Sequence, residues 1–175
     1  MSVSPRQNGD LVVRETVSLN TAATEVRVAP PDLSAAGVSF AVQRPTLVGL
    51  TLSAEGRSIP LQSDEVTQPR TISLTTASST FVVSYTLRHA VVRSRPSVAG
   101  RALGAIRPLR LTSDPQLTVM VDVAGRSVLS MVCPDLGPTG VANCAGPTDG
   151  GYRLSNPIPV NASLLLLQLD LDRAS

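Results

Sequence analysis

Apolar and polar residues alternate with a period of two along most of this chain, and no other feature constrains the fold more strongly. In the segment 11–19 (LVVRETVSL), the odd-numbered positions are apolar apart from Glu15, and the even-numbered positions after Val12 are polar. Successive side chains of a β-strand point to opposite faces, so such a segment offers one face to a core and one to solvent. No window sustains the 3.6-residue period of a helix. The pattern predicts an all-β fold.

Ten segments carry this strand pattern, and Gly, Pro, Asn and Ser separate them. They are 11–19, 24–29, 38–43, 46–53, 57–61, 70–76, 81–92, 116–123, 127–133 and 162–171. Helical turns are expected only over 32–37, between an Asp cap and a Gly stop, and over 99–106. Short strands at intervals of roughly ten residues are typical of a sandwich, in which each sheet buries one face against the other. We expect an antiparallel β-sandwich of about ten short strands with little helix.

Three dipeptides between apolar runs have the composition of tight hairpin turns. They are Asn8-Gly9, Glu55-Gly56 and Ala124-Gly125. Two-residue hairpin turns need positive φ, which Gly and Asn adopt at low cost. Each dipeptide therefore predicts a hairpin between its flanking strands.

The length of the chain, 175 residues, fits one domain over 1–175, and a Pro-rich stretch at 94–115 is the possible seam. Hydrophobic residues make up 42% of the chain but aromatic residues only 2%, so the core must consist of Val, Leu, Ile and Ala. No apolar run approaches the 18 or so residues of a spanning helix. We expect a soluble globular domain.

Cys133 and Cys144 are the only cysteines, and they flank a Gly/Pro-rich stretch that can turn back on itself. A disulfide between them is the favoured interpretation. A metal site would need two more ligands nearby, and the only histidine, His89, is 44 positions upstream of Cys133. A disulfide would place the domain in an oxidising, extracytoplasmic compartment, secreted or membrane-anchored. The first ten residues have no apolar core like that of a signal peptide, so we expect any export signal to lie outside this sequence.

The stretch 88–110 concentrates positive charge. Its basic residues are Arg88, Arg93, Arg95, Arg101, Arg107 and Arg110, with no acidic residue among them. The whole chain has a net charge of +2, so the remainder sums to −4. A GC-rich bacterial genome, which favours Arg codons, accounts for arginines on a solvated strand end and loop. The alternative is that these six side chains bind an anionic surface. Nucleic acid is the weaker partner, because the stretch has no aromatic residue on which bases could stack.

His89 and Glu15 both interrupt apolar rows of predicted strands. His89 is the only side chain that could act as the base of a Ser/His/Asp set, but no nucleophile elbow accompanies it. We favour a partly buried histidine near a strand end that hydrogen-bonds to backbone. For Glu15 we favour a solvated position where its strand leaves the core, and the alternative is a buried pair with His89 or an Arg.

The last predicted strand raises two further questions. Asp170 and Asp172 share one face and could supply half of a calcium site, although a charged strand end is the simpler interpretation. Leu164 to Leu167 is apolar on both faces. Such a strand is either central and covered on both sides or in contact with another subunit.

Taken together, these patterns favour a non-enzymatic, extracytoplasmic β-sandwich module of a bacterial envelope or membrane-anchored protein, with a binding or structural role. Its partner would be an unidentified protein or an anionic envelope component. The alternative is a self-assembling subunit of a shell, fibre or virion, and homo-oligomers stay possible. A hydrolase using His89 is the weakest of the three. We expect no catalytic residue, metal or cofactor.

Overall fold

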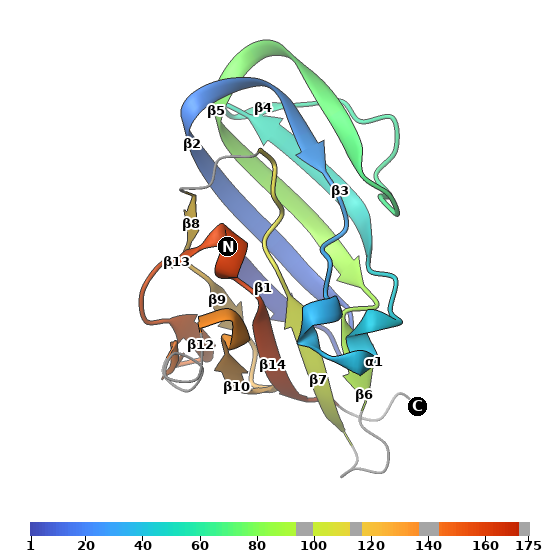
Figure 1. Cartoon of the computed structure of the whole chain (residues 1–175), viewed down its shortest axis with the longest axis vertical. Helices are drawn as coiled ribbons and strands as arrows, with labels where there is room; N and C mark the ends of the chain where they lie inside the picture. Colours follow the sequence, from blue (N-terminus) through green and yellow to red (C-terminus); the bar gives the residue numbers. More distant parts are fainter. Residues whose placement is uncertain (94–99, 113–116, 137–143, 172–175) are drawn as a thin grey trace.

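A computed structural model describes residues 1–93, 100–112, 117–136 and 144–171 of the chain (Figure 1). In chain order, the strands are β1 (Ser2–Pro5), β2 (Leu11–Val28), β3 (Thr46–Ala54), β4 (Arg57–Ser58), β5 (Arg70–Arg88), β6 (Val91–Arg93), β7 (Arg101–Ile106), β8 (Thr118–Val119), β9 (Asp122–Ala124), β10 (Val128–Val132), β11 (Ala145–Thr148), β12 (Gly151–Leu154), β13 (Ile158–Pro159) and β14 (Leu165–Asp170). The helical pieces are η1 (Ser34–Ala36), α1 (Val38–Ala41), η2 (Pro134–Leu136) and η3 (Val160–Ala162). Strands account for 57% of the structure and helices for 8%, so the all-β prediction is confirmed.

The strands form two main sheets and one short pair. The larger sheet has the order β11-β12-β9-β1-β2-β5-β3-β4, the smaller one has the order β10-β14-β7-β6, and β13 pairs with β8. All pairs are antiparallel except β1 with β9. The arrangement is the expected sandwich, with more strands than predicted and with two strands that are far from short.

β2 and β5 form one long ribbon that bends over at the top of the molecule in Figure 1. The pairing runs from Leu11 with Leu87 to Val28 with Arg70, and its register shifts between Ser18 and Glu25. Irregular register bends a ribbon and increases its twist, so a strand can turn the corner between two layers. The segments 11–19 and 24–29 therefore belong to one strand rather than two, and 70–76 joins 81–88 in the same way.

One core lies between the layers. The row that alternation predicts on β5 is buried, with Phe81, Val83 and Leu87 at 0% exposure. From the smaller sheet, Leu165 and Leu167 of β14 are also fully buried. β14 lies between β10 and β7, which agrees with the interpretation of this apolar strand as a central one.

The turn predictions are correct at two places and wrong at the third. Gly9 (φ 92°) closes the β1–β2 hairpin, and Glu55 with Gly56 (φ 48° and 76°) closes the β3–β4 hairpin. Gly125 also has a positive φ of 135°, but β9 and β10 do not pair with each other. Ala124-Gly125 instead connects strands of different sheets. The dipeptide predicts that the backbone turns, but it does not predict which strand the next strand pairs with.

Two of the predicted elements have the wrong type. The segment 38–43 is not a strand, because α1 begins one residue after η1 and buries Phe40 while Val38 and Val42 stay exposed. The segment 99–106 is not helical: it contains β7, which pairs with β14 and β6. The possible seam at 94–115 includes 94–99 and 113–115, which lie outside the described residues.

Cys133 and Cys144 are joined by a disulfide, as predicted, with their Cα atoms 6.1 Å apart. Cys133 directly follows β10 of the smaller sheet, and Cys144 directly precedes β11 of the larger sheet. The bond therefore links the two layers. It is consistent with an oxidising compartment.

Candidate functional site

Two arginines of the stretch 88–110 lie beside the β1–β2 turn. Arg88, at the end of β5, is exposed, and its Nε atom lies 3.8 Å from the Asp10 carboxylate. Arg93, at the end of β6, donates a hydrogen bond from Nη2 to the carbonyl oxygen of Gln7 at 3.1 Å. The stretch has no acidic residue of its own, so these partners come from the β1–β2 turn, which lies at the same end of the β2–β5 ribbon as Arg88.

β7 separates the other described arginines of the stretch. Arg101 is its first residue and Arg107 directly follows its last, so a rise of about 3.3 Å per residue puts the two Cα atoms about 20 Å apart. Arg101 pairs in register with Asp170 of β14. Arg95 lies outside the described residues. Arg101 and Arg107, which are close in sequence, therefore lie at opposite ends of β7.

Arg107 and Arg110 line a hollow of about 320 Å³. We call this hollow the arginine groove, and its lining residues are Arg27, Ala29, Pro30, Pro31, Asp32, Arg107, Pro108, Leu109 and Arg110. Beyond the bend of β2, the Arg27 N–H donates to the carbonyl oxygen of Leu111 at 2.9 Å. This bond holds the end of β2 beside the segment that follows β7, and so brings together two arginine-bearing segments about 80 positions apart.

The three guanidinium groups of the arginine groove differ in how they are used. Arg107 donates from Nη2 to Asp135 at 3.1 Å, and its buried Nε has no hydrogen-bond partner in the part of the chain that is described. Arg110 makes one long hydrogen bond of 3.4 Å to the carbonyl oxygen of Asn161. Arg27 is exposed, and its guanidinium group makes no hydrogen bond or ion pair within the described residues. Most of the donors of Arg27 and Arg110 thus stay available to a ligand.

Asp32 is the only carboxylate that lines the arginine groove. Its Oδ1 atom accepts a hydrogen bond from the backbone N–H of Ser34 at 2.9 Å. That bond, then the Ser34 hydroxyl and the Arg107 charge, hold the pKa of Asp32 below its usual range. Asp32 stays ionised at neutral pH, and three arginines outnumber it.

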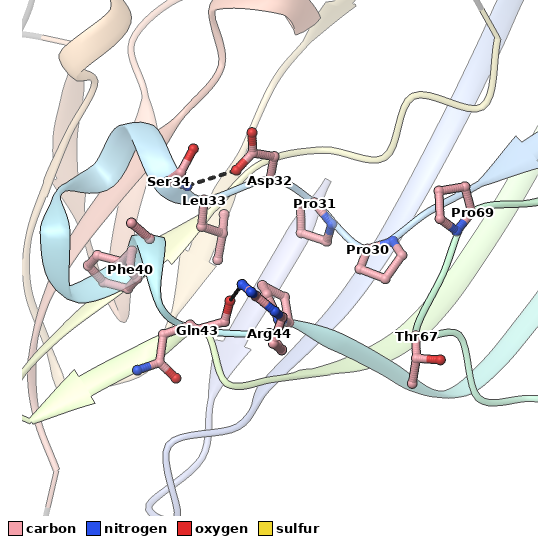
Figure 2. Close-up of a pocket in the computed structure, with 12 residues that line it drawn as sticks. Pro30, Pro31, Asp32, Leu33, Ser34, Phe40, Gln43, Arg44, Thr67 and Pro69 are labelled. Carbon is pink, nitrogen blue, oxygen red and sulfur yellow. Dashed lines mark hydrogen bonds between the residues drawn. The ribbon is translucent and has the colours of Figure 1, made fainter.

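Asp32 and the two prolines before it also form one wall of a neighbouring cleft of about 240 Å³ (Figure 2). Figure 2 shows the Asp32 carboxylate turned toward Ser34, with Leu33 and Phe40 among the residues that line the cleft. Arg44 lines the opposite wall and donates to the carbonyl oxygen of Gln43 at 3.2 Å. The segment 30–32 is therefore a ridge with cationic side chains on both sides.

A larger hollow of about 460 Å³ lies where the β2–β5 ribbon bends, between the β3–β4 hairpin and residues 73–78. Its charged lining residues are Glu55 and Arg57. The Glu55 carboxylate already accepts hydrogen bonds from the backbone N–H groups of Ser79 and Thr80, both at 2.9 Å. Its charge fastens the hairpin to β5 rather than facing a ligand.

Glu15 lies directly behind one wall of the arginine groove. Both interpretations of Glu15 from the sequence are wrong. It is buried, with 2% exposure, so it is not a solvated residue at the edge of the core. Its partners are the Tyr85 hydroxyl, at 2.6 Å, and the backbone N–H of Leu109, at 3.2 Å from each carboxylate oxygen. Within the described residues, neither His89 nor an Arg forms a hydrogen bond or an ion pair with it. A carboxylate can enter this core because a hydroxyl and an otherwise unpaired N–H satisfy it there.

Burial raises the pKa of Glu15 to about 7, although the hydrogen bonds from Tyr85 and Leu109 lower it in part. Burial, followed by the Glu15 charge, raises the pKa of Tyr85 well above 10, so the tyrosine hydroxyl remains a donor. Glu15 therefore changes charge near neutral pH while it holds Leu109, a residue of the groove wall.

His89 is exposed, which corrects the expectation of a partly buried histidine. β5 ends at Arg88, and His89 has a positive φ of 59°, so the backbone turns and the side chain leaves the buried row. The hydrogen bond to backbone is as expected: Nδ1 lies 3.1 Å from the carbonyl oxygen of Arg44. No hydrogen bond in the described residues joins His89 to a hydroxyl or a carboxylate.

The described residues hold no group of three His, Cys, Asp or Glu side chains that could bind a metal ion. Asp170 is exposed at the end of β14, while Asp172 lies outside those residues. Within the same ranges, no helix is long and apolar enough to cross a membrane.

Neither the models of known protein families nor the curated protein sequences include a match to this chain. The groove residues must therefore be judged on their chemistry. Sequence reasoning selected Arg107 and Arg110 but not Arg27 or Asp32. Alternation does place Arg27 on the outer face of its strand, but no local pattern indicates that this strand bends over to meet residues 107–111.

Proposed function

We propose that this protein is a non-enzymatic, extracytoplasmic β-sandwich module that binds an anionic component of a cell envelope. The observation that carries the proposal is the convergence of Arg27, Arg107 and Arg110 on one groove, in which Asp32 is the lining carboxylate and only Arg107 is already paired, with Asp135. A concave surface lined by one sign of charge raises the local concentration of ligands of opposite charge.

The disulfide supports the extracytoplasmic part of the proposal. Disulfides persist in oxidising compartments and are rare in the cytosol. Here the bond joins the two layers of the sandwich and closes a loop from Cys133 to Cys144, so it has a structural role. Such a role requires a compartment in which the bond stays formed.

The proposal assigns no catalytic residue. The one histidine is exposed and hydrogen-bonded to backbone, and Glu15, whose pKa suits a general base, is buried against Tyr85 and Leu109. A general base must reach the proton that it removes, and the Glu15 carboxylate faces the core. Its geometry suits holding the groove wall in place.

Co-sedimentation with lipid vesicles tests the proposed function. The wild-type protein is mixed with vesicles of phosphatidylglycerol and phosphatidylcholine, or of phosphatidylcholine alone. We expect binding to the anionic vesicles that weakens as salt rises, because exposed charges are screened over about 8 Å at physiological ionic strength. Equal binding to both kinds of vesicle, or no binding to the anionic ones at low salt, would reject an anionic lipid surface as the partner.

A further inference from the structure

We infer that the arginine groove is a binding site for one tetrahedral oxyanion, a phosphate group carried by a lipid headgroup or by a soluble polymer. This inference rests on the proposed function and names the site and the chemical group that it recognises. The observations that carry it are the placement of the donors, the rigidity of the groove walls and the size of the groove.

The donors reach the groove from two sides. Arg27 lies on the wall formed by the end of β2, and Arg107 and Arg110 lie on the wall formed by the segment after β7. A guanidinium group presents a planar fork of N–H donors that matches the oxygens of phosphate or carboxylate in pairs. Forks that come from two separate segments suit an acceptor with oxygens on more than one side.

A tetrahedral anion meets this requirement better than a carboxylate does. A carboxylate has two oxygens in one plane, and one fork can occupy both of them. A phosphate group has further oxygens that point toward a second fork. It also carries more charge to balance Arg27 and Arg110, because Arg107 is already paired with Asp135.

The walls of the groove are fixed before any ligand arrives. Pro30, Pro31 and Pro108 restrict the backbone on both sides. The Leu109 N–H is bonded to the buried Glu15, and the Arg27 N–H is bonded to Leu111. Rigid walls reduce the entropy that binding must remove, which matters most for a ligand group with few contacts.

The groove also has the size of a subsite for a charged group. Its volume of about 320 Å³ is at the lower end of the range for ligand pockets, roughly 300 to 1,000 Å³. The larger hollow at the ribbon bend contains one Arg and one Glu that is already hydrogen-bonded, so it offers no comparable excess of donors. Of the hollows described above, the arginine groove is the one suited to an anion.

The test is a titration followed by two-dimensional NMR of the ¹⁵N-labelled protein, with inorganic phosphate, sulfate and acetate as probes. We expect phosphate and sulfate to shift the backbone amides of Arg27 and of residues 109–111 in a saturable way, and acetate to shift them far less. Shifts of equal size and midpoint with acetate would overturn the tetrahedral preference. Shifts no larger at the groove than at Arg88 and Arg101 would overturn the site.

Two double variants with the same change of charge separate the groove from the rest of the stretch. Arg27→Ser with Arg110→Ser removes two forks from the groove, and Arg88→Ser with Arg101→Ser removes two arginines outside it. We expect the groove variant to bind phosphate at least about tenfold more weakly, since charge-assisted hydrogen bonds are lost, and the control to bind it as wild type does. Equal weakening in both variants would contradict the inference.

A third variant, Arg27→Lys with Arg110→Lys, keeps the charge and removes the planar forks. Weaker binding of phosphate by this variant supports recognition by the forks, while unchanged binding indicates attraction by charge alone and overturns the inference. The same three variants in the vesicle assay distinguish the sources of the phosphate. Saturable phosphate shifts without vesicle binding would reject the lipid surface and retain the groove, and vesicle binding unaffected by the groove variants would reject the groove alone.

Discussion

The two ends of β7 carry arginines from the same stretch of sequence and yet differ in construction. At the start of the strand, Arg101 pairs in register with the strand that carries Asp170, and no arginine from a distant segment joins it in a described hollow. At the other end, Arg107 and Arg110 meet Arg27 around the arginine groove, and the buried Glu15 holds the backbone between them. Charge density along a sequence therefore gives little information about charge density on a surface. What creates a site is a backbone that brings distant segments together and fixes them.

The largest effect is expected from Glu15→Ala. This change removes the side chain that holds the backbone at the groove end of β7 and leaves the Arg101 end as it is. The change leaves the Tyr85 hydroxyl and the Leu109 N–H buried without a partner and opens a cavity, so the free energy of unfolding should fall by roughly 4 kcal/mol. Urea unfolding at pH 6 measures it. Glu25→Ala, at an exposed position of the same strand, is the control and should change stability by about 0.5 kcal/mol or less. A similar loss in both variants would mean that Glu15 has no special role.

The next largest effect is expected from replacing both cysteines by serine. The disulfide closes a loop of about 12 residues, and its loss should lower the free energy of unfolding by about 3 kcal/mol. Asp135, the partner of Arg107, lies two residues beyond Cys133, so the loss should disturb the groove end of β7 more than the Arg101 end. NMR amide shifts report where the disturbance lies. Larger shifts around Arg101 than around Arg107 would contradict this coupling.

The pH dependence of stability should also distinguish the groove end of β7, which Glu15 holds, from the Arg101 end. Glu15 has a pKa of about 7 in the folded protein and 4.5 as its ordinary value, so the folded state binds the proton more tightly. The contribution of Glu15 to stability is then fully present below pH 4.5 and is lost as pH rises through about 7, which lowers the free energy of unfolding by roughly 2 kcal/mol between pH 5.5 and 7.5. Glu15→Gln keeps the acceptor oxygen for Tyr85 and Leu109, and should remove this slope. A slope that persists in the Gln variant would assign the pH dependence to other groups.

A smaller effect is expected from Gly100→Ala, directly before β7 at the end away from the groove. Gly100 has a φ of 93°, and a Cβ atom there would lie 2.6 Å from Oδ1 of Asp170 and 2.7 Å from the carbonyl oxygen of Leu171. We expect a loss of roughly 1 to 2 kcal/mol, with phosphate binding unchanged. Gly150→Ala is the control, because a Cβ atom at Gly150 meets nothing within 4 Å. Weaker phosphate binding by the Gly100 variant would show that the two ends are not independent.

The period of the sequence predicts the fold class and much of the core, because alternation is a local property of each strand. It does not predict the bend that merges 11–19 with 24–29 in β2, since a bend depends on register between strands. For the same reason Arg27 could not be linked to Arg107 and Arg110. The disulfide was predictable from two cysteines and the Gly/Pro-rich sequence between them.

Glu15 and His89 show the limit of the alternation rule most clearly. Both stand in apolar rows, and each lies where the other was expected to lie: the carboxylate is buried and the imidazole is exposed. The Glu15 side chain stays in the buried row because Tyr85 and Leu109 donate hydrogen bonds to its carboxylate. Leu109 is 94 positions away in the sequence. His89 leaves its row because the strand ends one residue earlier. Partners and strand ends are tertiary properties, and they decide where a polar residue in an apolar row will lie.

The central claim is that anions bind at the groove end of β7, and crystals of the protein soaked in selenate test it most directly. Selenate is a tetrahedral oxyanion, and the anomalous scattering of selenium locates it without reference to the shape of the density. We expect the strongest non-methionine anomalous peak in the arginine groove, within hydrogen-bond distance of the Arg27 and Arg110 guanidinium groups. A strongest peak beside Arg88 or Arg101, or no peak in the groove in a crystal where no neighbouring molecule covers it, would contradict the account.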